Sequence, residues 1–190
     1  MDTSDSRTLA LVTGATGYIG GRLAPRLLEA GYRVRVLARN PDRLRDVPWA
    51  GDVEIVRGDL LDEDTLEAAF ADVDVAYYLV HSMTGSHGKS SFEDSERRSA
   101  ENVARVAKAA GVSRLVYLGG LHPDEAELSR HLRSRTEVGE ILMASGVPTA
   151  VLQAGVVIGS GSASFEMVRH LTEVLPYMPA PRLVRNRIQP

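Results

Sequence analysis

This sequence contains Leu9-Ala-Leu-Val-Thr-Gly-Ala-Thr-Gly-Tyr-Ile-Gly20, in which a short apolar run leads into a glycine-rich turn and then into a helical pattern. Gly14, Gly17 and Gly20 lie three residues apart. In a dinucleotide site the first glycine permits a tight turn, the second lets the backbone approach a pyrophosphate, and the third lets helix and strand pack closely. The free N–H groups at the helix start then attract the phosphates. The stretch therefore predicts dinucleotide binding, with a purely structural glycine turn as the alternative.

Strand-like and helical segments alternate along the rest of the chain. Six short apolar runs indicate strands, at Leu9–Thr13, Tyr32–Ala38, Val53–Val56, Val73–Val80, Arg114–Leu118 and Pro148–Gln153. Strands separated by helices in this order predict an α/β fold with a doubly wound parallel sheet and right-handed crossovers. The expected architecture is a Rossmann fold with strand order 3-2-1-4-5-6 and helices on both faces, which binds ligands at the carboxyl ends of its strands.

Composition narrows the function classes. We expect the 190 residues to form a single domain, residues 1–190, with residues 1–7 disordered. The net charge of -3 predicts no nucleic-acid partner, and the absence of cysteine excludes disulfides and thiol catalysis. The five histidines lack the spacing of a metal site, so no metal is expected. With neither a signal peptide nor a long apolar run, we expect a cytoplasmic protein without a membrane partner.

Several further motifs make the chain resemble a known family. They are Thr13-Gly-Ala-Thr-Gly-Tyr-Ile-Gly20, Gly58-Asp59-Leu60, Asn102-Val-Ala-Arg-Val-Ala-Lys-Ala-Ala-Gly-Val112, Leu115-Val-Tyr-Leu118 and Gln153-Ala-Gly155. With them the chain resembles the atypical short-chain dehydrogenases/reductases, and within these the NmrA-like NAD(P)H-binding proteins. In such relatives the chain continues past this point into further substrate-binding structure, so that part is expected to be truncated here.

The resemblance implies a cofactor pocket built from three segments. Its residues are Thr16, Gly17, Tyr18 and Ile19 against the pyrophosphate, Asp59 and Leu60 at the adenine, and Leu79, Val80 and His81 along the adenosine ribose and the approach to the nicotinamide. Two alternatives stay open. Asp59 is also a residue type that caps turns, and Leu79 and Val80 also suit an ordinary sheet core.

Arg39 bears on which cofactor is bound. NAD sites usually carry an acidic residue at the end of the second strand, where it bonds the ribose hydroxyls. Here that strand ends in Leu37-Ala38-Arg39-Asn40, with no carboxylate before Asp42. A guanidinium can bind a 2′-phosphate bidentately, so Arg39 favours NADP(H), with NAD still possible. Alternatively, Arg39 stacks on the adenine or points into solvent.

The expected catalytic residues depart from the family pattern. Most dehydrogenases of the family carry Y-x-x-x-K on the helix after the fifth strand and a hydroxyl residue at the end of that strand. This strand ends in Leu118-Gly119-Gly120, and the helix carries His131 and Arg135 at the tyrosine and lysine positions. His131 is a candidate proton donor and Arg135 a candidate ligand of the ribose. The alternative is a solvated basic helix face.

Two functions follow from this pattern. The first is an NADP(H)-dependent oxidoreductase that transfers hydride to a small carbonyl, quinone or flavin-like acceptor. The second is a non-catalytic NADP(H) sensor that acts on a regulatory protein partner. A sugar-nucleotide epimerase is disfavoured because the tyrosine is missing. A loop from Gly155 to Gly161 is expected to form a mobile wall over the nicotinamide or the substrate.

Overall fold

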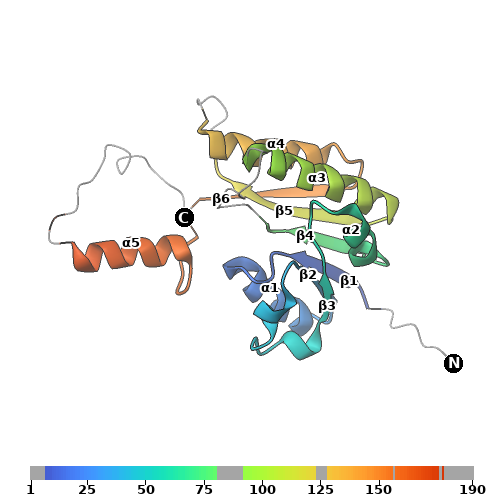
Figure 1. Cartoon of the computed structure of the whole chain (residues 1–190), viewed down its shortest axis with the longest axis horizontal. Helices are drawn as coiled ribbons and strands as arrows, with labels where there is room; N and C mark the ends of the chain where they lie inside the picture. Colours follow the sequence, from blue (N-terminus) through green and yellow to red (C-terminus); the bar gives the residue numbers. More distant parts are fainter. Residues whose placement is uncertain (1–6, 81–91, 123–127, 156, 176, 178–190) are drawn as a thin grey trace.

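The computed structural model describes residues 7–80, 92–122, 128–155, 157–175 and 177. Strands and helices alternate along it (Figure 1). The strands are β1 (Leu9–Thr13), β2 (Arg33–Ala38), β3 (Glu54–Arg57), β4 (Val75–Tyr78), β5 (Arg114–Gly120) and β6 (Thr149–Ala154). The helices are α1 (Tyr18–Glu29), α2 (Glu63–Phe70), α3 (Phe92–Ala109), α4 (Arg130–Met143) and α5 (Ala163–Val174), with short 3₁₀ turns at Pro41–Leu44 and Ala50–Asp52.

The six strands form one parallel sheet in the order β3-β2-β1-β4-β5-β6. This confirms the Rossmann fold and the strand order expected from the sequence. The order reverses between β1 and β4, where Val12 lies beside Val36 on one side and beside Tyr77 on the other. A reversal of this kind leaves a crevice at the carboxyl ends of the two central strands, because their crossover connections leave in opposite directions.

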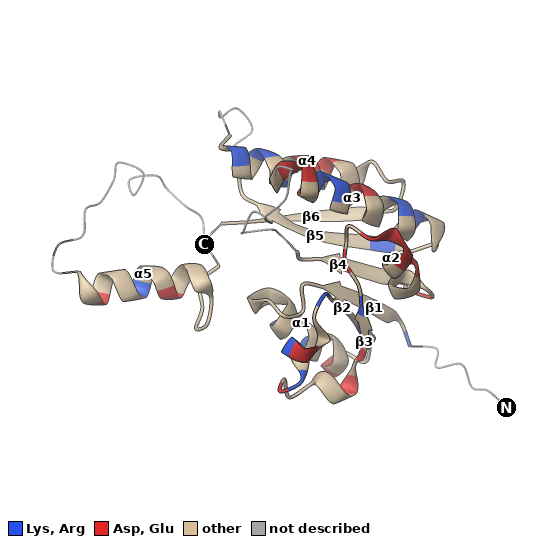
Figure 2. Cartoon of the chain, in the orientation of Figure 1, with Lys and Arg blue, Asp and Glu red and all other residues tan. Residues whose placement is uncertain are grey.

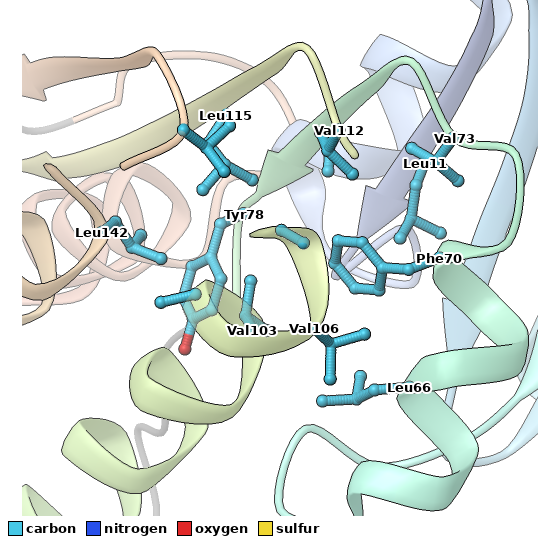
Figure 3. Close-up of a cluster of buried hydrophobic side chains, with 14 of the residues drawn as sticks. Leu11, Leu66, Phe70, Val73, Tyr78, Val103, Val106, Val112, Leu115 and Leu142 are labelled. Carbon is cyan, nitrogen blue, oxygen red and sulfur yellow. The ribbon is translucent and has the colours of Figure 1, made fainter. Parts of the chain in front are cut away.

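The sheet is buried between two groups of apolar side chains. One face packs against α1, through Val12, Ala24, Leu27 and Val36. The other packs against α2, α3 and α4 and holds the larger core, drawn in Figure 3, where Phe70, Tyr78 and Leu115 come from separate elements. Burial on both faces explains why the five residues of β1 are all buried and nearly all apolar.

Charged residues lie mainly on the outer surfaces of the helices. Figure 2 shows basic and acidic residues mixed along α3 and α4. Arg97, for example, pairs with Asp94 on its own helix and lies 3.6 Å from Glu137 of α4. Among the described residues, no helix combines the length and the apolar character that a bilayer crossing requires.

The end of β5 differs from the sequence prediction in a way that matters for the site. β5 runs two residues further than expected, because Gly119 and Gly120 still pair with Gln153 and Ala154 of β6. In Figure 1, α5 lies apart from the helices that cover the sheet, and it buries none of its residues. The expected disorder of residues 1–7 concerns positions that lie, except for Arg7, outside the described residues.

Candidate functional site

The carboxyl ends of β1 and β4 are tied together by Thr13. Its buried hydroxyl donates a hydrogen bond to the carbonyl of Tyr77 at 3.1 Å and accepts one from the amide of Leu79 at 3.2 Å. These bonds continue the pairing of the two strands past the last ladder residue. They hold Leu79 and Val80 directly beside the glycine-rich turn.

Gly14 makes that close approach possible. Its φ of +76° lies in the left-handed region, where a residue with a side chain would be strained. A Cβ here would lie 3.2 Å from the backbone of Leu79 and 3.3 Å from a methyl group of Val80. The first glycine is therefore required both by its backbone conformation and by its neighbours.

The beginning of α1 faces the crevice with its backbone donors open. Gly17 caps the helix without any side-chain hydrogen bond, and the first turn carries no acidic residue. A Cβ on Gly17 would lie 3.2 Å from the Gly14 carbonyl oxygen, so the absent side chain leaves the backbone bare at this point. The first amides of a helix lack partners within it and bind anions. This cradle fits a pyrophosphate.

Gly20 serves the packing of α1 on the turn. A Cβ at this position would lie 2.8 Å from Cα of Ala15 and from the carbonyl carbon of Gly14, closer than real contacts of this kind. Gly14 and Gly20 thus have the turn and packing roles that their spacing predicted, and the approach of a pyrophosphate to Gly17 stays a prediction. Thr16 is exposed at the tip of the turn, and Tyr18 and Ile19 are half-buried.

The segment after β6 lies against the start of α1. The Arg22 guanidinium stacks on the Tyr18 ring at 3.9 Å from its centroid, and it donates to the carbonyl of Ser160 at 2.8 Å. Gly159 approaches the Tyr18 hydroxyl so closely that a Cβ there would collide with it. The loop expected to form a wall over the ligand is thus fixed to the helix that carries the phosphate cradle.

Arg39 is exposed directly after β2. Within the part of the chain that the structure describes, its guanidinium has no hydrogen bond or ion pair. The first carboxylate after it, Asp42, forms an ion pair with Arg45 at 2.7 Å, and the Asp42 amide is capped by the Asn40 side chain. A free cation therefore stands at the strand end where NAD sites carry an acid.

Asp59 and Leu60 follow β3 and have unlike surroundings. One carboxylate oxygen of Asp59 accepts a hydrogen bond from the Leu61 amide at 3.0 Å, which is the turn-capping role. The Leu60 side chain is buried in the larger core, and its carbonyl accepts from Asn102 at 3.0 Å. Contact of either residue with an adenine stays a prediction.

The remaining expected cofactor residues follow β4. Leu79 and Val80 are half-buried and pack against opposite cores, Leu79 toward α1 and Val80 toward the larger cluster. Both are thus part of the sheet packing, and an edge of each stays accessible. His81 lies outside the described residues.

The two expected catalytic residues of α4 point to different places. His131 is exposed and stacks on Phe92, with ring centroids 5.7 Å apart. Arg135 is half-buried beside the end of β5, where a Cβ on Gly120 would lie 3.7 Å from its guanidinium nitrogen. Of the two, Arg135 thus lies against the end of a strand, whereas His131 lies against Phe92.

The tyrosines of β4 and β5 belong to the core. Burial raises the pKa of Tyr117 to about 12; nearby Arg135 lowers it and Glu96 raises it. Its hydroxyl donates to the carbonyl of Arg135 at 3.1 Å. Burial raises the pKa of Tyr78 still further. Neither phenol is therefore suited to release a proton near neutral pH.

Sequence reasoning missed one polar pair at the same edge. Gln153 of β6 lies with its amide nitrogen 3.3 Å from Nε2 of His122, which follows β5. A lone histidine after two glycines carries no recognisable motif, so only the pairing of β5 with β6 reveals it. The described residues contain no cluster of three or more histidine, aspartate or glutamate side chains that could hold a metal ion.

Comparison with known proteins agrees with this geometry. A sequence model of the NAD(P)H-binding family matches residues 14–161. The chain is 38% identical over 141 residues to the (4-alkanoyl-5-oxo-2,5-dihydrofuran-3-yl)methyl phosphate reductase of Streptomyces griseus, in an alignment that covers 74% of this chain and 45% of that protein.

Solved structures share the fold. The NADPH-dependent quinone oxidoreductase of Escherichia coli, complexed with NADPH, is 25% identical with a TM-score of 0.63, over 76% of this chain and 48% of that one. The Citrobacter triphenylmethane reductase, complexed with NADP(H), is 24% identical with a TM-score of 0.66, over 87% and 55%. The chain spans about half the length of these relatives.

Proposed function

The chain belongs to the NAD(P)H-binding family of atypical short-chain dehydrogenases/reductases, and from this premise we propose that it acts as an oxidoreductase. It uses NADP(H) to reduce a small carbonyl, quinone or flavin-like acceptor. The observation that carries the proposal is the open glycine cradle at the start of α1, which fits a pyrophosphate. The similarity to reductases, some of which were crystallised with NADP(H) or NADPH, supports it.

The chain's own residues would divide the work of binding. The first amides of α1 hold the pyrophosphate, and Arg39 binds the 2′-phosphate of the adenosine ribose. Arg135 binds a hydroxyl of the nicotinamide ribose from α4. When bound, the dihydronicotinamide supplies the hydride, so the protein has chiefly to orient the acceptor against it and to exclude water. Water or His131 would supply the accompanying proton.

A preference for NADP(H) rests on the charge at the end of β2. In the described part of the chain, Arg39 is an unpaired cation, whereas Asp42 is already engaged by Arg45. A phosphate placed there meets a free guanidinium, and a ribose diol meets no free carboxylate. We therefore expect tighter binding of NADPH than of NADH.

Turnover tests this function. NADPH-loaded protein is mixed with a panel of quinones, flavins and aldehydes, and oxidation is followed by the loss of absorbance at the nicotinamide band. We expect oxidation with at least one acceptor, and we expect a Gly17→Val variant to lose both binding and oxidation. Tight NADPH binding without oxidation by any acceptor would contradict the enzymatic role.

Tight NADPH binding without oxidation would favour the function of a sensor. One observation supports this alternative: among the described residues, no side chain known to donate protons in the family stands at the end of β5, and His131 stacks on Phe92 instead. In a sensor, NADP(H) would change the affinity for a regulatory protein. Binding of the cofactor alone is common to both functions.

A further inference from the structure

The end of β5 carries an unusual polar pair. Gly119 and Gly120 end the strand without side chains, and the Leu121 amide extends the pairing by donating to the Ala154 carbonyl at 2.9 Å. His122 is therefore the first polar side chain beyond the strand. It is held beside β6 by Gln153, at 3.3 Å between the two side-chain nitrogens.

One ring nitrogen of His122 has no hydrogen-bond partner among the described residues. With the Gln153 amide nitrogen as donor, Nε2 of the ring accepts, so the neutral ring carries its proton on Nδ1. Nδ1 is buried and has no partner among the described residues. A buried donor without an acceptor is rare and costly, so each such group calls for an explanation.

A second orphan donor lies at the same strand end. Nε of Arg135 is also buried without a partner among the described residues. Its guanidinium and Cδ lie 3.7 and 3.6 Å from the place where a Gly120 side chain would be. Two buried donors without partners at one strand end are complementary to oxygen atoms of a ligand, since both need acceptors.

We propose that His122, oriented by Gln153, donates a hydrogen bond from Nδ1 to a carbonyl oxygen of the acceptor, an inference that rests on the proposed oxidoreductase function. This hydrogen bond restricts the proposed acceptors to compounds with a carbonyl oxygen, such as quinones and aldehydes. A fixed donor at that oxygen stabilises the negative charge that develops on it during reduction. His122 thus supplies a hydrogen bond where this strand end lacks the usual hydroxyl.

Binding without turnover tests this assignment. NADP⁺-loaded protein is titrated calorimetrically with 1,4-naphthoquinone-2-sulfonate and with naphthalene-2-sulfonate, two probes that differ in their carbonyl oxygens and share the sulfonate. We expect the wild type to bind the quinone roughly tenfold more tightly, the size of one good hydrogen bond. His122→Phe should abolish that difference. His170→Phe, on exposed α5, is the matched control and should keep it.

Two further readouts separate ligand binding from a structural role. Because Nδ1 has no partner among the described residues, His122→Phe should leave Tm unchanged or raise it, and NADPH affinity should be unchanged. In ¹⁵N spectra of labelled histidine, the signal lost in His122→Phe should report an Nδ1–H tautomer and should shift only with the quinone.

Three outcomes would overturn the assignment of His122, and a fourth would separate it from the proposed activity. Equal binding of both probes by the wild type, an undiminished quinone preference in His122→Phe, or a fall in Tm with that substitution overturns the assignment. A His122-dependent quinone preference in a protein that oxidises NADPH with no acceptor leaves this site standing and removes the proposed activity. The two hypotheses therefore fail separately.

Discussion

Substitutions of Gly17 and Gly20, which lie three residues apart, should affect different properties of the protein. Gly20→Ala forces a Cβ to within 2.8 Å of backbone atoms that cannot move freely, so it should cost roughly 1–3 kcal/mol of unfolding free energy. Gly17→Ala meets only the Gly14 carbonyl oxygen, at 3.2 Å, but its methyl group lies in the phosphate cradle. It should lower NADPH affinity about tenfold, or about 1.4 kcal/mol, with little loss of stability.

Urea unfolding and calorimetric NADPH titration of both variants check this contrast. Gly51→Ala is the control, because a Cβ there meets nothing within 4 Å. It should leave both stability and binding unchanged. If Gly17→Ala unfolds more easily while it binds NADPH normally, then the turn is structural and the cradle does not hold phosphate.

A second residue-level prediction concerns Arg39. Arg39→Asp replaces a free guanidinium with a carboxylate that repels a 2′-phosphate, so NADPH binding should weaken by more than tenfold and NADH binding by less than twofold. The control Arg43→Asp makes the same change of charge in the following 3₁₀ turn. It should affect both cofactors little. Equal losses for NADPH and NADH in calorimetry would refute the phosphate contact.

At the level of elements, the alternation of apolar runs was sufficient to predict the sheet. The six strands and their order follow from pattern and handedness, because parallel strands buried on both faces are nearly continuous apolar runs. The end of β5 could not be predicted. Gly119 and Gly120 have low strand propensity, and only their pairing with Gln153 and Ala154 makes them strand residues.

The dependence on pairing between strands also explains why part of the candidate site could not be predicted from the sequence. Gly14, Gly17 and Gly20 lie within seven residues of one another, so their spacing alone predicts the cradle. His122 and Gln153 are 31 residues apart and meet only through the pairing of two strands. His131 and Arg135 share a helix spacing, yet the packing of Phe92 on His131 directs the two side chains to different places. Contacts between elements are not encoded in local pattern.

The contact between α1 and the segment after β6 yields a prediction about local motion. Arg22→Ala removes both the stacking on Tyr18 and the hydrogen bond to Ser160. Residues 157–162 should then exchange their amide hydrogens at least several-fold faster, while Tm changes little, because the segment buries little apolar surface. Arg26→Ala is the control, since Arg26 pairs with the exposed Glu29 of its own helix. Unchanged exchange would show that Arg22 does not fix the segment.

The whole molecule should lose stability in alkali through its buried phenols. Burial raises the pKa of Tyr117 to about 12 and that of Tyr78 further, above the ordinary value of 10.0. The unfolded chain therefore releases these protons above pH 10 while the folded chain retains them. Stability is fully present below pH 10 and falls above it, by about 1.4 kcal/mol per pH unit for each tyrosine.

Urea unfolding at pH 9, 10, 11 and 12 measures this slope. Tyr117→Phe removes one of the two phenols, so its stability should decline less steeply above pH 10 than that of the wild type. Its stability at pH 9 should be lower, because the hydrogen bond to the Arg135 carbonyl is lost. Parallel curves for the two proteins above pH 10 would show that Tyr117 ionises normally in the folded state.

Among the described residues, no helix covers one face of the sheet at β5 and β6. α4 packs over Tyr117 and Val151, so their neighbours in each strand point to the opposite face, where Leu152 is 55% exposed. Exposed apolar surface binds anilinonaphthalene dyes. We expect the folded protein, saturated with NADPH, to enhance the fluorescence of anilinonaphthalene sulfonate. Leu152→Gln should reduce that enhancement while stability changes by no more than about 0.5 kcal/mol.

The control Met143→Gln alters an equally exposed residue on α4, at 53%, and should leave the dye fluorescence unchanged. Equal dye binding by all three proteins would mean that the open sheet face is not the apolar surface that the dye detects.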